Sequence, residues 1–153
     1  MRIYIDGDAC SVTWLVEKIA KEYDVPVTIV CDDMHNIQSD YSEIIKVPCG
    51  KDSTDMRIAM EVKEKDIVVT QDYGVAALVL SKGASAVTKS GLRFTDKNID
   101  RLLFERHVMR IERGKTKGMV KRSHGTKEKK IGFTEALSGI IEENAESAER
   151  EVS

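Results

Sequence analysis

The stretch "DIVVTQDYGVAALVLSKGASAVT", residues 66–88, contains a strand, a helix and a second strand in immediate succession. Asp66–Thr70 is a short apolar run rich in β-branched residues, which is typical of a buried strand. Tyr73–Lys82 is predicted to be a helix, ended by Gly83 in the left-handed position that follows a last turn. Ala84–Thr88 is again a strand. Apolar strands separated by a helix favour a parallel sheet with helices on both faces.

The same alternation extends towards the N-terminus. Strand patterns occupy Arg2–Asp6, Val27–Cys31 and Ile44–Val47, and helix patterns occupy Cys10–Tyr23 and Ser53–Lys63. After residue 94 the pattern becomes helical, with predicted helices at Asp96–Arg110, preceded by Thr95 as N-cap, and at Thr134–Glu143. We therefore expect one α/β domain over residues 1–143 and an acidic, frayed tail over 144–153.

Length and composition limit the class of protein. With 153 residues the chain is long enough for one domain with a core of its own. No apolar run reaches the length that crosses a bilayer, and the strand-like N-terminus does not resemble a signal peptide. Cys10, Cys31 and Cys49 show no zinc-ligand spacing, and we interpret them as reduced thiols of a cytoplasmic protein.

A basic segment lies behind the formal net charge of −2. Residues 101–130 contain eleven Lys or Arg against three Glu, a net charge of +8. Its part "RGKTKGMVKRSHGTKEKK", residues 113–130, is predicted to be an exposed, mobile loop. Such a segment can bind phosphates, or it can be a solvated face or one that docks against the acidic tail. The candidate nucleic-acid ligands are Lys115, Lys117, Lys121, Arg122 and Lys127.

Acidic residues follow strands and open helices at one predicted edge of the sheet. Asp6 ends the first strand and Asp8 follows it, Asp72 follows "DIVVT", and Asp55 lies in the first turn of the preceding helix. In a parallel sheet, ligands bind beyond the carboxyl ends of the strands, and these acids can approach one another there if the first strand and "DIVVT" are neighbours. Clustered carboxylates repel unless a cation lies between them, and oxygen ligands suit Mg²⁺ or Mn²⁺. We therefore expect a metal site formed by Asp6, Asp8, Asp55 and Asp72.

Helix capping is the alternative for several of these acids. Asp52, three residues before Asp55, resembles an N-capping arrangement, and Asp8 and Asp72 each precede a predicted helix. Asp6 is harder to explain in this way, because a carboxylate at the end of a buried strand is costly without a partner.

The chain resembles the YaiI/YqxD family of bacterial proteins over roughly residues 1–143. Four stretches carry the resemblance: "MRIYIDGDAC", "DSTD", "DIVVTQDYGVAALVLSKGA" and "FTDKNI". That family is thought to be related to PIN-like nuclease domains, which are three-layer α/β/α sandwiches with a mostly parallel sheet and an acidic metal pocket. The resemblance implies phosphodiester cleavage of nucleic acid, with RNA the expected partner. It assigns the acidic roles to Asp6, with Asp8 as a further candidate, to Asp55, and to Asp72 with Thr70 beside it; in our hypothesis Thr70 orients the water.

Departures from the family pattern leave other functions open. Ser11 and Val12 stand where Pro and a basic residue are usual, Met56 replaces a second acid after Asp55, and Lys130 stands in place of an arginine. A smaller set of carboxylates would bind a metal more weakly, and this would suit a PIN-like module that binds RNA or protein without cutting it. The Asp-x-Asp spacing after a strand also resembles a haloacid-dehalogenase-like phosphatase, although the later acidic pair of that class is not found.

Overall fold

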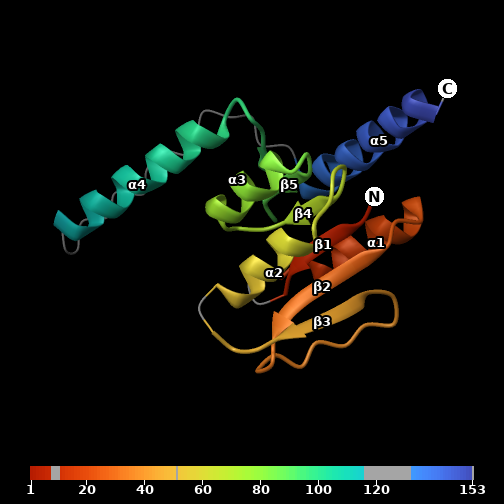
Figure 1. The fold of residues 1–153 in the computed structure, drawn as a ribbon, viewed down its shortest axis with the longest axis horizontal. Coiled ribbons are helices and arrows are strands. Elements are labelled where there is room, and N and C mark those ends of the chain that lie inside the picture. Colours follow the sequence, from red (N-terminus) through yellow and green to blue (C-terminus); the bar gives the residue numbers. More distant parts are fainter. Residues whose placement is uncertain (8–10, 51, 116–131, 153) are drawn as a thin grey trace.

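The described residues form an α/β sandwich around one six-stranded sheet (Figure 1). The computed structural model describes residues 1–7, 11–50, 52–115 and 132–152. In spatial order the strands are β3 (Glu43–Val47), β2 (Val27–Asp32), β1 (Ile3–Asp6), β4 (Ile67–Val69), β5 (Ser85–Val87) and β6 (Arg93–Phe94). All neighbours are parallel except β5 and β6. The predicted, mostly parallel α/β sheet is therefore confirmed.

Helices cover both faces of this sheet, because its strands are apolar on both sides. The helices are α1 (Thr13–Tyr23), α2 (Ser53–Glu61), α3 (Tyr73–Ser81), α4 (Ile99–Lys115) and α5 (Phe133–Val152). One core packs α1 and α5 against Ile3 and Ile5, and the other packs α2, α3 and the start of α4 against Tyr4 and Val68. Alternate residues of β1 therefore face different helices, and Asp6, the residue after Ile5, lies on the same face as Tyr4.

Strand β6 and the start of α4 differ from the sequence-based expectation. Gly91, with φ of 93°, allows the tight turn through which the chain returns antiparallel to β5. The backbone N–H of Thr95 then donates to Asn98 Oδ1 at 2.8 Å, and the N–H of Asn98 donates to Thr95 Oγ1 at 3.2 Å. Because these two side chains close a separate turn, α4 begins at Ile99 instead of Asp96.

The acidic tail is helical, contrary to the expectation that it is frayed. Helix α5 continues through Asn144, whose side-chain amide donates to the carbonyl of Lys65 at 3.1 Å. The ammonium of Lys65 pairs with Glu151, about two helical turns further along α5, at 2.6 Å. Two contacts to the same loop, between α2 and β4, hold the last turns in place.

Helix α4 extends well beyond the sandwich (Figure 1). The basic loop predicted after it falls mostly at residues 116–131, outside the described residues. Among the helices that are described, none is both long enough and apolar enough to span a bilayer.

Candidate functional site

Asp6 is the last residue of β1 and is 7% exposed. Side chains alternate along a strand, so Asp6 lies on the same face as Tyr4, which belongs to the core under α2 and α3. Strand β1 lies in the middle of the sheet and pairs directly with β4. A carboxylate is therefore placed at the C-terminal edge of two central strands, on the face that α2 and α3 cover.

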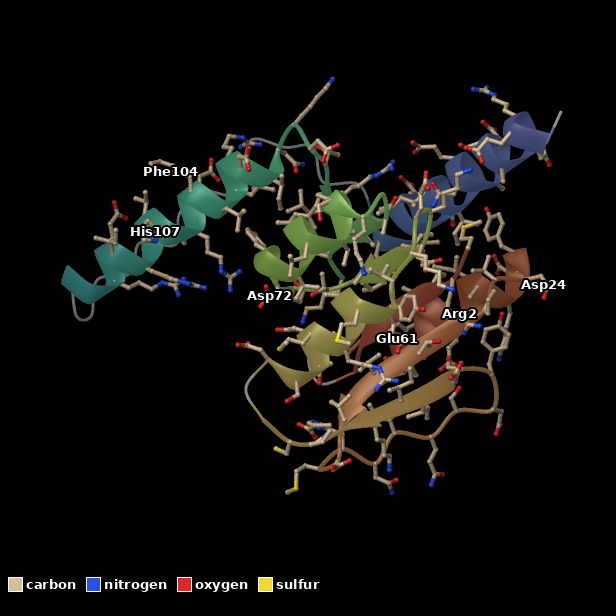
Figure 2. The ribbon with its side chains drawn as sticks, in the orientation of Figure 1. Arg2, Asp24, Glu61, Asp72, Phe104 and His107 are labelled. Carbon is tan, nitrogen blue, oxygen red and sulfur yellow. The ribbon has the colours of Figure 1, made fainter. Side chains whose placement is uncertain are left out.

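Thr70 and Asp72 follow β4 at the same edge. Thr70 is 2% exposed, and its hydroxyl accepts a hydrogen bond from the backbone N–H of Asp72 at 3.0 Å. Asp72 caps α3, because its Oδ1 accepts from the N–H of Val75 at 3.0 Å. The expected capping role of Asp72 is thus present, and it engages one of the two carboxylate oxygens. Figure 2 shows Asp72 at the N-terminal end of α3.

A groove of about 430 Å³ runs between α2 and α3 and brings Asp55 and Asp72 to one surface. Asp52 also lines it, as do the exposed side chains of Met56 and Met60. Asp52 occupies the N-cap position of α2 with φ of 63° but makes no side-chain capping bond. The predicted N-cap position of Asp52 is therefore confirmed, but its side chain does not cap the helix and lines the groove instead.

The donors at this edge suit a hard divalent cation in kind, since Asp6, Asp55 and Asp72 offer carboxylate oxygens and Thr70 a hydroxyl. Among the residues that the structure describes, no three His, Cys, Asp or Glu side chains form a ready-made metal site. Asp8 lies outside the described residues. Mg²⁺ is commonly held by one or two carboxylates together with water and substrate phosphate, so this donor set fits a cation that binds with its substrate.

A second cavity, of about 210 Å³, is also lined by Asp72. Arg106 and Arg110 of α4 line it together with Tyr73 and Gly74. A Cβ at position 74 would lie only 3.1 Å from Asp72 Oδ1. The absence of a side chain on Gly74 therefore leaves room for that oxygen. Both arginines belong to the basic segment, but the sequence predicted no specific role for them. Their spacing of four residues on a helix puts them on one face. The side chains of Lys115, Lys117, Lys121, Arg122 and Lys127 lie outside the described part of the chain.

Asp32 is a further acid at this edge, at the end of β2 and one residue beyond the predicted strand Val27–Cys31. Its Oδ1 lies 2.7 Å from His35 Nδ1 and accepts from the N–H of Met34 at 2.9 Å. The hydrogen bond with His35 lowers the pKa of the Asp32 carboxyl below its ordinary value of 3.8. This carboxylate is therefore held by its own loop.

Replacing His35 by Ala is expected to raise the pKa of Asp32 towards 3.8, because the largest cause of its lowered value is removed. The lowered pKa means that the contact stabilises the fold above the unfolded pKa and that this stabilisation is lost as pH falls through the folded value. A ¹³C NMR titration of the Asp32 carboxyl measures the change. His107→Ala is the control, since His107 lies on α4 (Figure 2). An unchanged Asp32 titration in His35→Ala would contradict the pairing.

Comparison with known proteins gives one family. A family model described as "Uncharacterized BCR, YaiI/YqxD family" matches residues 4–143. A "UPF0178 protein" of Ruminiclostridium cellulolyticum is 44% identical over 149 residues, covering 95% of this chain and 95% of the relative. Another, from Clostridium novyi, is 54% identical over 108 residues, covering 71% of this chain and 72% of the relative.

A solved structure, that of a mutant of Rae1 (YacP) from Bacillus subtilis, matches with 18% identity and a TM-score of 0.38. The match covers 78% of this chain and 87% of that one.

Proposed function

The chain belongs to the YaiI/YqxD family, and we propose that it is a metal-dependent nuclease or phosphodiesterase that acts on nucleic acid, with RNA as the expected substrate. The observation that carries this proposal is the position of Asp6, Asp55 and Asp72. All three lie at the carboxyl edge of the sheet. Asp6 lies on the face that α2 and α3 cover, Asp55 lies in the first turn of α2, and Asp72 caps α3. That edge is where open α/β sheets bind ligands.

Each residue has a distinct part in this chemistry. A bound Mg²⁺ or Mn²⁺ supplies an activated water and stabilises the charge that develops on the phosphate oxygens. Asp6, Asp55 and Asp72 are the proposed ligands, with Asp8 as a further candidate. Thr70 positions Asp72 through its hydrogen bond to the Asp72 backbone, and its hydroxyl proton is left to donate to a water in the site.

A second candidate function is a module that binds nucleic acid or protein without cutting it. One observation favours it: the described residues contain no ready-made three-residue metal site. The side chain at the position of a second acid, Met56, is apolar and 63% exposed on the groove. Such a module would keep affinity for its partner but would hydrolyse nothing.

A cleavage screen tests the proposal. Single-stranded and structured RNA and DNA are incubated with wild-type protein and Mg²⁺ or Mn²⁺, and Asp72→Asn is compared. Asn also caps helices, so this variant should fold, and we expect its cleavage rate to fall about 100-fold, or about 2.7 kcal/mol in the barrier. Asp100→Asn is the matched control, because Asp100 is an exposed acid in the first turn of a different helix.

The results separate the two candidates. Cleavage that is equal in wild type, Asp72→Asn and Asp100→Asn would point to a contaminating nuclease or to a different site. If no nucleic acid is cut but RNA is bound, the binding module replaces the nuclease.

A further inference from the structure

We propose that Arg106 and Arg110 bind a backbone phosphate of the nucleic acid in the cavity beside Asp72. This inference rests on the proposed function for the identity of the ligand, but its geometry is independent of any metal. The cavity of about 210 Å³ is lined by Asp72 and by the two arginines of α4. A phosphate held there would lie directly next to a proposed metal ligand.

Arg106 is held in place before any ligand arrives. Its guanidinium lies over the ring of Tyr73, 4.8 Å from the ring centroid. The Tyr73 ring is itself fixed by an edge-on contact with the buried Phe94, with centroids 5.0 Å apart. A stacked guanidinium keeps its planar set of N–H donors free at the edge, which is the geometry that suits phosphate oxygens.

In the described part of the chain, neither arginine forms an ion pair with a carboxylate. Four other arginines form ion pairs at 2.6–3.5 Å, which are Arg2 with Glu43, Arg57 with Glu61, Arg93 with Glu143 and Arg101 with Glu105. Within the described residues, neither Arg106 nor Arg110 lies within ion-pair distance of an acid. Because Asp72 is the one acid among the described residues that line the cavity, the two arginines leave it with a net positive charge, which favours an anion.

The cavity offers contacts to phosphate and not to bases. Its only aromatic side chain, Tyr73, has its ring occupied by Arg106 and Phe94, so no platform for base stacking is left among the lining residues. We therefore expect binding that depends on salt and hardly on sequence. Asp72 opposes the phosphate electrostatically when no cation is present.

Fluorescence anisotropy with labelled RNA and DNA of the same mixed sequence, in EDTA, tests this directly. Arg110→Ala should weaken binding at least about 5-fold and reduce the slope of log affinity against log salt by about 0.7, the value for one phosphate contact on a single strand. Arg110→Lys should recover part of the affinity. Arg57→Ala should leave it unchanged, because that arginine is already paired with Glu61.

Two further variants strengthen the test. Arg106→Ala should weaken binding similarly, and a thermal melt shows whether losing its contact with Tyr73 also disturbs α4. Asp72→Asn should bind more tightly than wild type without metal, because a negative charge beside the phosphate is removed.

The outcomes distinguish this inference from the proposed function. Unchanged affinity and salt slope in Arg110→Ala and Arg106→Ala would overturn the phosphate site, whether or not the protein cleaves nucleic acid. Weakened binding in both variants, with no cleavage by the wild type, would support the phosphate site and overturn the nuclease.

Discussion

Asp66→Ala is expected to lower the free energy of unfolding by about 2–4 kcal/mol, although Asp66 lies far from the candidate site. Asp66 is 6% exposed and precedes β4. Its Oδ1 accepts from the backbone N–H of Arg2 and its Oδ2 from that of Lys63, both at 2.9 Å. Removing the carboxylate leaves two backbone donors without their partner where β1 and β4 begin, and each costs about 1–3 kcal/mol.

Urea unfolding followed by circular dichroism measures this loss. Asp66→Asn should lose less than Asp66→Ala, because the amide keeps one acceptor oxygen but presents an NH₂ group to the other N–H donor. Glu64→Ala, an exposed acid two residues away, is the control and should change the free energy by less than about 0.5 kcal/mol. A loss in Asp66→Ala as small as that of the control would show that the two hydrogen bonds are unimportant for stability.

The sequence predicted the central elements well because their pattern is strong. Strands β1, β2, β4 and β5 are short apolar runs between helices, and each lies within a residue or two of its predicted bounds. Their parallel pairing then follows from the alternation of strand and helix. The match to residues 4–143 of a family model is consistent with the quoted motifs.

Elements whose stability comes from distant contacts were not predictable in the same way. The last turns of α5 carry an acidic, weakly apolar sequence, and they are held by contacts of Asn144 and Glu151 with Lys65, far away in the chain. Strand β6 is only two residues long and depends on the turn at Gly91. Trp14 is 68% exposed while Val16 is buried, because the choice of buried face on α1 is made by the sheet and α5.

The candidate site, too, was predictable only in part from the sequence. The placing of Asp6, Thr70 and Asp72 at one edge follows from parallel pairing, which the alternating pattern indicates, but the pairing of β1 with β4 is known only from the structure. The cavity between Asp72 and the arginines of α4 does not follow from the pattern, because it depends on the direction in which α4 leaves the sandwich and on the contact of Arg106 with Tyr73. Helix spacing alone shows that Arg106 and Arg110 share a face, but not what that face meets.

Asp6→Asn is expected to have the opposite profile to Asp66→Ala. Asp6 and Asp66 are both buried acids, but they lie at opposite ends of the parallel strands, one at the end of β1 and the other before β4. Asn has nearly the shape of Asp and keeps one oxygen, and it removes the cost of burying a charge. We therefore expect the free energy of unfolding of Asp6→Asn to stay within about 1 kcal/mol of wild type, or to rise.

The same substitution should reduce metal-dependent cleavage by about 100-fold or more, because a neutral amide is a poor ligand for a hard cation and does not offset its charge. Urea unfolding and single-turnover cleavage are measured on Asp6→Asn and Asp66→Asn in parallel. Loss of stability with little loss of cleavage is expected only for Asp66→Asn, and loss of cleavage with intact stability only for Asp6→Asn. If Asp6→Asn is strongly destabilised while it still cleaves, then Asp6 is a structural acid like Asp66, and the cation must be held elsewhere.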